Sequence, residues 1–447
     1  MELQFFGFLP ETGKRILRIG QRALLIIFFM NLGMTVAQAV AADLTGPTEK
    51  NHESQAIRFS LDEAMAMFLK QNFQVILAKY GIDLARAREI TAGLFPNPEV
   101  SVGLFSSMTQ GCNTARCGGI MPQVSQLFLI AGKRGYQIES AALGTAGAEA
   151  EFEDAVRQLS ATLKETYIRV KALEEHLEVD QKIKNRLFKL IQETSSDVQG
   201  RIKERKRIRL ELMVVKAERE VIKDLRELGE TSLDLRILLG IPPETNITLT
   251  TPLAYHRVEP DIGALRASVL NSRPDLRAKR LWQARRKTDL KLAKSFRFPD
   301  ATVGLGLMLQ GPQGPDNQQQ WNLGLSVPLP IFNRNQGGIQ QAETAIQVAD
   351  ADYRQAENRV LNELDRAYHR FLESRQLVEV YHKGVLDRAL TLLEMAQQDR
   401  QQGQLGILEL VDAARAAQET KEDYIDALFS YQRAVFRLEN AAGRSIQ

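Results

Sequence analysis

The chain has 447 residues, enough for two or three ordinary domains, and a formal net charge of +3. Apolar residues make up 44% of it and charged residues 25%, which is the composition of a folded protein and excludes an intrinsically disordered one.

The N-terminal segment has the pattern of a secretory signal peptide. It carries four basic residues ahead of its apolar run, which are Lys14, Arg15, Arg18 and Arg22. An apolar run at 23–30 and then a group of small residues follow, so we expect 1–42 to be a signal peptide and 43–59 an N-terminal periplasmic arm. A single membrane anchor is the alternative, but the run is shorter than the ~20 residues that a spanning helix needs. No later apolar run has that length, so we expect the exported chain to be soluble or to form a closed β-barrel.

The first predicted helix runs from Leu61 to Leu94, a stretch rich in Ala, Arg, Lys and Leu. Ser60 with Glu63 three residues later is a capping-box pattern, which marks the start of a helix. Pro96 marks its end, because proline cannot continue a helix.

Two short strands are predicted next. The segments 100–104 and 124–129 have the alternation of apolar and small or polar residues that is typical of a hairpin. The loop between them holds the chain's two cysteines, Cys112 and Cys117. Because an exported chain meets an oxidising compartment, we expect a disulfide; free thiols or a metal site are the alternatives, and two cysteines are too few ligands for a metal.

A long helix with a heptad pattern follows the first hairpin. Its apolar residues fall seven apart at Val156, Leu163, Val170, Leu177 and Ile191. Lys184 is the one polar residue in this row. A helix of this length spans ~90 Å at ~1.5 Å per residue, turns near Gly200 and returns through 210–239. Such heptads indicate coiled-coil packing, and helices this long need lateral neighbours, which favours an oligomer.

The second half repeats the first at one fixed spacing. Glycines and prolines recur 203 positions apart, as in Pro96 with Pro299, Gly103 with Gly306, Gly135 with Gly338 and Gly200 with Gly403. Because these residues have special backbone preferences, the spacing predicts a duplicated backbone shape. We therefore expect two structural repeats, 60–255 and 256–447.

The second copy predicts the same elements more clearly. A helix over Pro274–Ser295 is opened by Ser272, and strands follow over 303–309 and 321–329. One apolar and one small or polar face is what membrane strands of ~9–11 residues require. Two hairpins give four strands, and since the smallest membrane barrels have about eight, several copies must share one barrel.

The last predicted helices again form a long hairpin. An uninterrupted helix is expected from Gly338 to about Arg400, with a return helix over 408–442. The heptad row of the helix from Gly338 to Arg400 is Leu364, Phe371, Val378, Val385 and Leu392.

Three runs resemble the TolC-like outer-membrane efflux proteins. They are Arg273 to Ala278, Leu94 to Pro98, and Ser326 to Gly337, the last of which reads Ser-Val-Pro-Leu-Pro-Ile-Phe-Asn-Arg-Asn-Gln-Gly. The last run is most similar to the heavy-metal branch, the outer-membrane subunits of cobalt-zinc-cadmium or nickel pumps. The resemblance covers about Ser60 to Gly443.

The resemblance implies an α+β fold in which each protomer of a homotrimer gives four strands to a twelve-stranded transmembrane β-barrel. Long coiled-coil helices form a periplasmic tunnel below it. The implied partners are a periplasmic adaptor (membrane fusion) protein and a proton-driven inner-membrane transporter of the resistance-nodulation-division type. The implied function is passive conduction in the outer membrane, with divalent heavy-metal cations as cargo. A multidrug or other small-molecule duct has the same architecture, and a periplasmic adaptor or coiled-coil rod leaves the hairpins unexplained.

The two helix turns are the candidate functional sites, because in the resembled family they form the periplasmic aperture and meet the adaptor. The candidates are Gly200, Arg201, Lys203, Arg205 and Arg207 in the first turn, and Gly403 and Asp412 in the second. Either the basic turn forms salt bridges to the adaptor or to the neighbouring turn, or it is a solvated helix face. It is more basic than the family pattern, and a ring of arginines repels metal cations.

Catalytic and cofactor motifs are missing from the sequence. It has no nucleotide-binding glycine loop, nucleophile elbow or metal-binding His pair. The five histidines are scattered and are predicted to be helix-surface residues: His52, His176, His256, His369 and His382. We expect no enzyme activity, no cofactor, no nucleic-acid partner and no tight metal site, which suits a duct because tight binding slows release.

Overall fold

The computed structural model describes residues 57–106, 118–195, 201–310 and 319–446. The chain divides into the units Met1–Ala56 and Ile57–Gln447, and every described residue belongs to the second. The predictions for the signal peptide, most of the N-terminal arm, both cysteines, Gly200 and His52 lie outside the described residues.

One order of elements occurs twice. The first copy consists of α2 (Leu61–Gln71), α3 (Phe73–Gly93), β2 (Glu99–Ser106), β3 (Gly118–Phe128), α5 (Lys133–Ser195) and α6 (Arg201–Leu239). The second copy consists of α7 (Ile262–Ser272), α8 (Pro274–Ser295), β5 (Ala301–Gln310), β6 (Gln320–Ser326), α9 (Gln336–Val380), the π-turn η1 (Tyr381–Val385), α10 (Leu386–Gln401) and α11 (Ile407–Ala442). The start of α9 follows that of α5 by 203 positions (336 − 133). The domain boundaries at 59/60 and 255/256 stay predictions.

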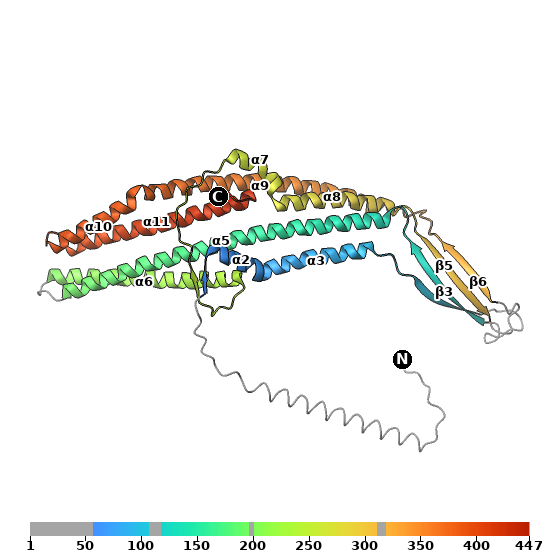
Figure 1. Ribbon diagram of the computed structural model, residues 1–447, viewed down its shortest axis with the longest axis horizontal. Coiled ribbons are helices and arrows are strands. Elements are labelled where there is room, and N and C mark those ends of the chain that lie inside the picture. Colours follow the sequence, from blue (N-terminus) through green and yellow to red (C-terminus); the bar gives the residue numbers. More distant parts are fainter. Residues whose placement is uncertain (1–56, 107–117, 196–200, 311–318, 447) are drawn as a thin grey trace, which may run out of the picture. The chain divides into compact units, whose positions relative to one another are not determined.

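Within the unit Ile57–Gln447, the four long strands lie at one end of the long helices (Figure 1). The end of α5, the start of α6 and the α10–α11 turn lie at the other end. Between the two copies, the short strand β1 (Ile57–Phe59) pairs in parallel with β4 (Ile247–Leu249). A segment that we call the strap, residues 251–259, then leads from β4 to α7.

The four long strands form one antiparallel sheet in the order β2-β3-β5-β6. Its register aligns four apolar residues across the sheet, Val100, Val124, Leu305 and Leu323. The neighbouring row, on the other face, is Glu99, Ser125, Gly304 and Gly324. The predicted α+β class, with one apolar and one small or polar sheet face, is confirmed.

The last strand is shorter than predicted. β6 ends at Ser326 and does not reach Leu329. Pro328 and Pro330 explain the early end, because proline has no N–H to continue a ladder.

The first helix is broken where one helix was predicted. The capping box is confirmed, since the Ser60 N–H donates to Glu63 at 2.7 Å and the Glu63 N–H donates to the Ser60 hydroxyl at 3.2 Å. α2 nevertheless ends at Asn72, which is buried and caps the start of α3 by accepting hydrogen bonds from two backbone N–H groups. Its Nδ2 donates to the Leu238 carbonyl at 2.8 Å. The packing of α2 against α6 therefore sets the break.

The predicted helix over Pro274–Ser295 is α8, but Ser272 does not open it. Ser272 ends α7 and its hydroxyl donates to the Ala442 carbonyl at 2.7 Å. The residue before the helix is Arg273, which gives no side-chain cap and is buried between Asp275 and Glu363.

The predicted uninterrupted helix from Gly338 to Arg400 is also wrong. It is divided by η1, where Gly384 has φ +103°. Before η1 the heptad row is buried, as predicted, at Leu364, Phe371 and Val378. Beyond it, Val385 is 37% and Leu392 52% exposed.

The change of phase has a simple cause. At η1, Lys383 and Gly384 leave the helical conformation, so the helix is kinked and the residues after the kink face in rotated directions. The half-buried positions accordingly become Leu386 and Leu393, each one residue after its predicted counterpart.

Within the described residues, no helix combines the length and the apolar character needed to cross a membrane.

A buried ion pair joins the two copies where strands meet helices. Lys133 is 2% exposed, and its Nζ donates to Asp300 Oδ1 and to the Phe298 carbonyl, both at 2.7 Å. Asp300 Oδ1 also accepts from the Ile130 N–H at 3.0 Å. The start of α5 is therefore fastened to the start of β5.

The Ser326–Gly337 run, which carries the family resemblance, forms the matching junction of the second copy. Asn335 has φ +57° and Gly132, 203 positions earlier (335 − 132), has φ +73°. Asparagine and glycine are the residues that tolerate this region best. The Asn335 Nδ2 also donates to the Ala293 carbonyl at 2.8 Å, which fixes the entry to α9 against α8.

Candidate functional site at the ends of the helical hairpins

The first hairpin end carries the basic residues predicted as functional. Gly200 lies outside the described residues, as do the side chains of Arg201 and Lys203, although Arg201 is the first residue of α6. Arg205 is exposed and forms no ion pair with any residue that the structure describes. Of the two predicted basic residues whose side chains are described, Arg205 and Arg207, Arg205 is therefore the one without an ion pair.

Arg207 differs from Arg205, because its charge is matched on its own helix. Its guanidinium donates to Glu204 at 2.8 and 3.1 Å and to Glu211 at 3.0 Å. The hydrogen bond from Arg207 lowers the pKa of Glu204. These i,i+3 and i,i+4 spacings are visible in the sequence, and they make Arg207 the weaker candidate for an external contact.

The second hairpin end is a tight turn built on Gly403. Gly403 has φ +76°, and its N–H donates to the Arg400 carbonyl at 3.1 Å. The next N–H, of Gln404, returns to the Asp399 carbonyl at 2.9 Å. Such reversed bonds after a left-handed glycine end a helix and satisfy its last carbonyls. Asp412 is exposed on α11, a turn and a half past the start of that helix.

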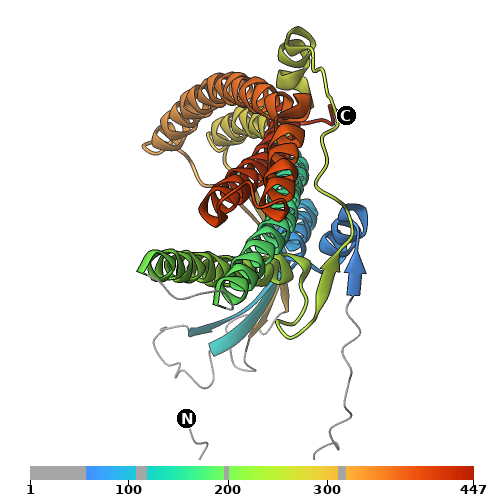
Figure 2. The ribbon, with the colours of Figure 1, turned by 90° about the vertical axis from the view of Figure 1, so that its left-hand side faces the viewer.

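A second hydrophobic cluster holds the two hairpin ends together. It buries residues from all four helices: Leu187, Leu190, Leu210, Met213, Ala396, Ile407, Leu410 and Val411. Figure 2 looks toward these ends and shows the α10–α11 pair (orange and red) beside the α5–α6 pair (green). The sequence predicted both turns but not their joint packing, and among the described residues no ion pair joins α6 near the first turn to Asp412.

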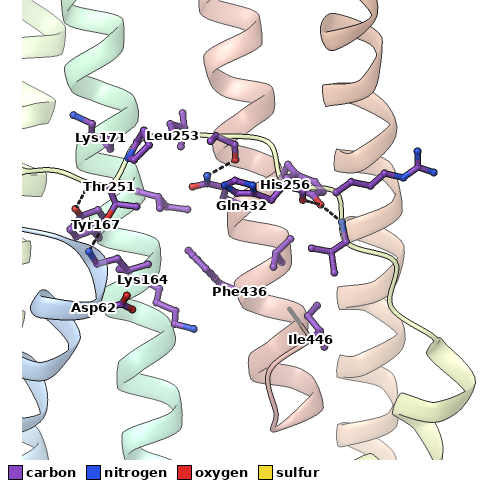
Figure 3. A pocket seen from close by; sticks show the side chains of 18 of the residues that line it. Asp62, Lys164, Tyr167, Lys171, Thr251, Leu253, His256, Gln432, Phe436 and Ile446 are labelled. Carbon is purple, nitrogen blue, oxygen red and sulfur yellow. Dashed lines mark hydrogen bonds between the residues drawn. The ribbon is translucent and has the colours of Figure 1, made fainter.

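The strap lies across the helices and encloses a cavity of about 620 Å³ with α2, α5 and α11 (Figure 3). Tyr167 of α5 accepts the Thr251 N–H at 3.1 Å and donates to the Phe59 carbonyl at 2.8 Å. Gln432 of α11 donates to the Ala254 carbonyl at 2.7 Å, and the figure shows both side chains directed at the strap. Tyr431 donates to the His256 carbonyl at 2.6 Å.

Both lysines that line this strap cavity are already paired. Lys164 contacts Glu439 at 3.0 Å, and Lys171 contacts Glu174 at 2.9 Å. The cavity therefore fastens the strap to the helices and leaves few groups free for a ligand.

The histidines were predicted to lie on helix surfaces, but not all of them do. His369 and His382 are exposed on the helical hairpin, but His256 is in the strap. His176 is half-buried, and its Nε2 lies 3.2 Å from Asp426 Oδ1. Burial opposes protonation, yet the hydrogen bond to Asp426 raises the pKa of His176 overall. In the part of the chain that the structure describes, no group of three His, Cys, Asp or Glu residues is arranged to hold a metal.

Comparisons with known proteins agree with this geometry. The family model described as outer membrane efflux protein matches residues 265–444, which lie in the second copy. The cobalt-zinc-cadmium resistance protein CzcC of Cupriavidus metallidurans is 22% identical over 423 residues, 94% of this chain and 98% of that protein.

Two solved structures show the same fold. The open-state MtrE outer membrane channel of Neisseria gonorrhoeae has a TM-score of 0.73 at 18% identity, covering 87% of this chain and 89% of that one. CusC has a TM-score of 0.69 at 16% identity, covering 90% and 96%. Residues 265–444 therefore match the outer membrane efflux protein family, and the described chain has the fold of the outer-membrane channels MtrE and CusC.

Proposed function

We propose that this chain is the outer-membrane duct of a tripartite pump that exports divalent heavy-metal cations. The family consists of transport channels and not of enzymes, and we propose that this chain too acts as a passive channel without catalysis. The observation that carries the cargo is the nearly full-length relationship to CzcC, whose name assigns it to cobalt, zinc and cadmium resistance.

The exposed face of the sheet supports assembly into a homotrimer. Leu104 is 81% and Leu323 76% exposed on the apolar side, and the two outer strands β2 and β6 each have one unpaired edge within the protomer. Four strands are too few to close, while three protomers give twelve. In this arrangement lipid covers the apolar face and each open edge pairs with a neighbour.

The helical part supports the same assembly independently. α6 has apolar residues seven apart that are exposed in the protomer, Ile208, Val215 and Ile222. A heptad row facing water is costly, whereas a neighbouring helix covers it in a coiled coil. Both the sheet and α6 therefore require lateral partners.

The remaining parts of the pump follow from the family. We propose a periplasmic adaptor protein and an inner-membrane transporter of the resistance-nodulation-division type as partners. The signal peptide over 1–42 and the disulfide between Cys112 and Cys117 stay predictions. A drug or other small-molecule duct has the same architecture, so the cargo depends on the Ser326–Gly337 run and on the likeness to CzcC.

We further propose that the basic hairpin end is the periplasmic aperture, where Arg205 contacts acidic residues of the adaptor or of a neighbouring turn. Arg205→Glu should lower resistance in cells while the amount of folded trimer stays the same. Any effect of Arg207→Glu on resistance should be less specific, because this substitution also removes the ion pairs of Arg207 with Glu204 and Glu211. Lys216→Glu is the matched control, since Lys216 is also exposed on α6 but further from the turn. Equal resistance in the Arg205 and Lys216 variants would refute the contact.

The cargo is tested in cells with and without this chain. Resistance to and accumulation of zinc, cobalt, cadmium, nickel and copper are measured beside a panel of drugs. Hypersensitivity to one or two metals alone supports the metal duct. Drug sensitivity with normal metal tolerance would transfer the chain to the multidrug class. Extraction of the protein without detergent would contradict the channel itself.

A further inference from the structure

A second groove, of about 920 Å³, lies between α5, α9 and α11. It is on the side of α11 opposite to the strap cavity. Ala434 lines this groove, whereas Gln432, two residues earlier, lines the strap cavity. Residues two apart point to nearly opposite sides of an α-helix, because each residue turns it by ~100°.

The groove is lined by seven arginines, and we call it the arginine groove. They are Arg157, Arg273, Arg359, Arg366, Arg370, Arg433 and Arg437. Five carboxylates line it as well: Asp154, Glu165, Asp275, Glu363 and Glu373. The arginines therefore outnumber the acids.

Four of the five carboxylates are already bound by arginines of the groove. Arg157 binds Asp154 at 2.6 Å, and Arg437 binds Glu165 at 2.7 Å. Arg273 binds both Asp275, at 2.7 Å, and Glu363, at 2.9 Å. The fifth, Glu373, is exposed and forms no ion pair with the described residues.

Three guanidinium groups remain without a carboxylate among the described residues: Arg366, Arg370 and Arg433. Arg366 donates only to the carbonyl of Asn362 on its own helix, at 3.2 Å. Arg433 is half-buried and lies over the Phe429 ring at 4.9 Å. Burial lowers the pKa of Arg433, and the charge of Arg437 lowers it further, while the charge of Glu165, which Arg437 binds, partly offsets this. Arg370 of α9 adds to the lowering. Positive charges therefore exceed negative ones around Arg433.

We propose that the arginine groove binds a compact multivalent oxyanion, of the phosphate or small polycarboxylate class, with Arg370 and Arg433 as its main donors. The planar guanidinium fork matches carboxylate and phosphate oxygens in a bidentate way. An anion here would offset charges that now face one another across the groove. Binding is independent of the pump's cargo, so it holds for a metal duct and for a drug duct.

The test measures binding to the purified full-length protein in a neutral detergent. Calorimetric titrations use inorganic phosphate and, separately, citrate, with chloride at the same ionic strength as the reference. The test variant is Arg370→Gln with Arg433→Gln. The control is Arg354→Gln with Arg415→Gln, which removes the same charge from exposed arginines of the same two helices outside the groove.

We expect the wild type and the control to bind one or both anions saturably, and the test variant to bind at least about tenfold more weakly. Thermal unfolding gives a second readout, in which the anion should raise the midpoint of the wild type but not of the test variant. If that double variant fails to fold, Arg370→Gln alone carries the test, because Arg370 is exposed. The proposal would be overturned if the wild type bound neither anion saturably. It would also be overturned if the test and control double variants bound the anion equally weakly.

Discussion

The most informative perturbation concerns a buried carboxyl cluster where α5, α6 and α11 meet. Asp180 and Asp224 are 6% and 8% exposed and hydrogen-bond to each other. Gln418 of α11 donates to Asp180 at 2.7 Å and to Glu422 at 2.6 Å. Burial raises the pKa of Asp180 to about 6, with Glu422 adding to the rise. Burial and the charge of Asp180 raise the pKa of Asp224 to about 6.

The direction of the pH effect follows from these raised values. A carboxyl whose pKa is higher in the folded state than the ordinary 3.8 binds more protons when folded, between about pH 4 and pH 6. Stability therefore falls as the pH rises through this window, and the full cost is present above about pH 6. A shift of about two units corresponds to ~3 kcal/mol for one isolated group. Because the two groups share the effect, we take roughly 2 kcal/mol for neutralising one of them.

Asp224→Asn isolates this cost. The amide has nearly the shape of the carboxyl and keeps a donor for Asp180 at every pH. We expect the free energy of unfolding to rise by roughly 2 kcal/mol at pH 7.5 and the gain to disappear for the most part by pH 4. With an unfolding entropy of about 0.8 kcal/mol/K for a unit of roughly 390 residues, the thermal midpoint rises by about 2–3 °C.

The assay is thermal unfolding of the detergent-solubilised protein from pH 4 to pH 8. Asp234→Asn is the matched control, because Asp234 is exposed on the same helix and has no ion pair with the described residues. His176 and Lys223 also face Asp224 and partly offset its cost. A lower midpoint for Asp224→Asn at pH 7.5 would refute the reasoning, as would a gain that is the same at pH 4 and pH 8.

Two further substitutions test the backbone and the junction through the same thermal midpoint. Gly384→Ala should lower the free energy of unfolding by about 1–3 kcal/mol, because φ +103° suits only glycine, whereas Gly229→Ala in an exposed part of α6 should raise it by up to ~1 kcal/mol. Asp300→Asn should cost about 2–4 kcal/mol by leaving the buried Lys133 charge without its partner, whereas Asp352→Asn, in an exposed pair, should cost less than ~1 kcal/mol. Equal effects within either pair of variants would contradict the stated cause.

The elements that the sequence predicted correctly have local causes. The capping box at Ser60, the proline that starts α8 and the alternation along the strands each depend on residues a few positions apart. Because glycines and prolines recur at one fixed spacing, the elements predicted in one copy also predicted those of the other. For Gly132 and Asn335, the duplicated feature is the left-handed backbone itself, with two different residues that both tolerate it.

The features that the sequence did not predict depend on distant partners. Asn72 ends α2 through a bond to Leu238, and Lys133 is neutralised by Asp300, 167 positions later (300 − 133). Nothing near Asn72 or Lys133 identifies these partners. The arginine groove is a case of the same kind, because its charges come from three helices. By contrast, the internal pairing of Arg207 was present in the sequence as Glu204 and Glu211 at helical spacing.

The error in the second heptad row shows how one residue changes what a helix can contact. Counting sevens assumes an unbroken helix, and the absence of proline favoured that assumption. Gly384 was the contrary signal, since a glycine inside a helix is the residue that permits a φ of +103°. Once η1 has rotated the chain, Leu393 and Ala396, and not Leu392, face the cluster that joins the hairpin ends. The contact between the two hairpin ends therefore depends on this turn, and removing it should loosen that cluster before it affects the core around Phe371.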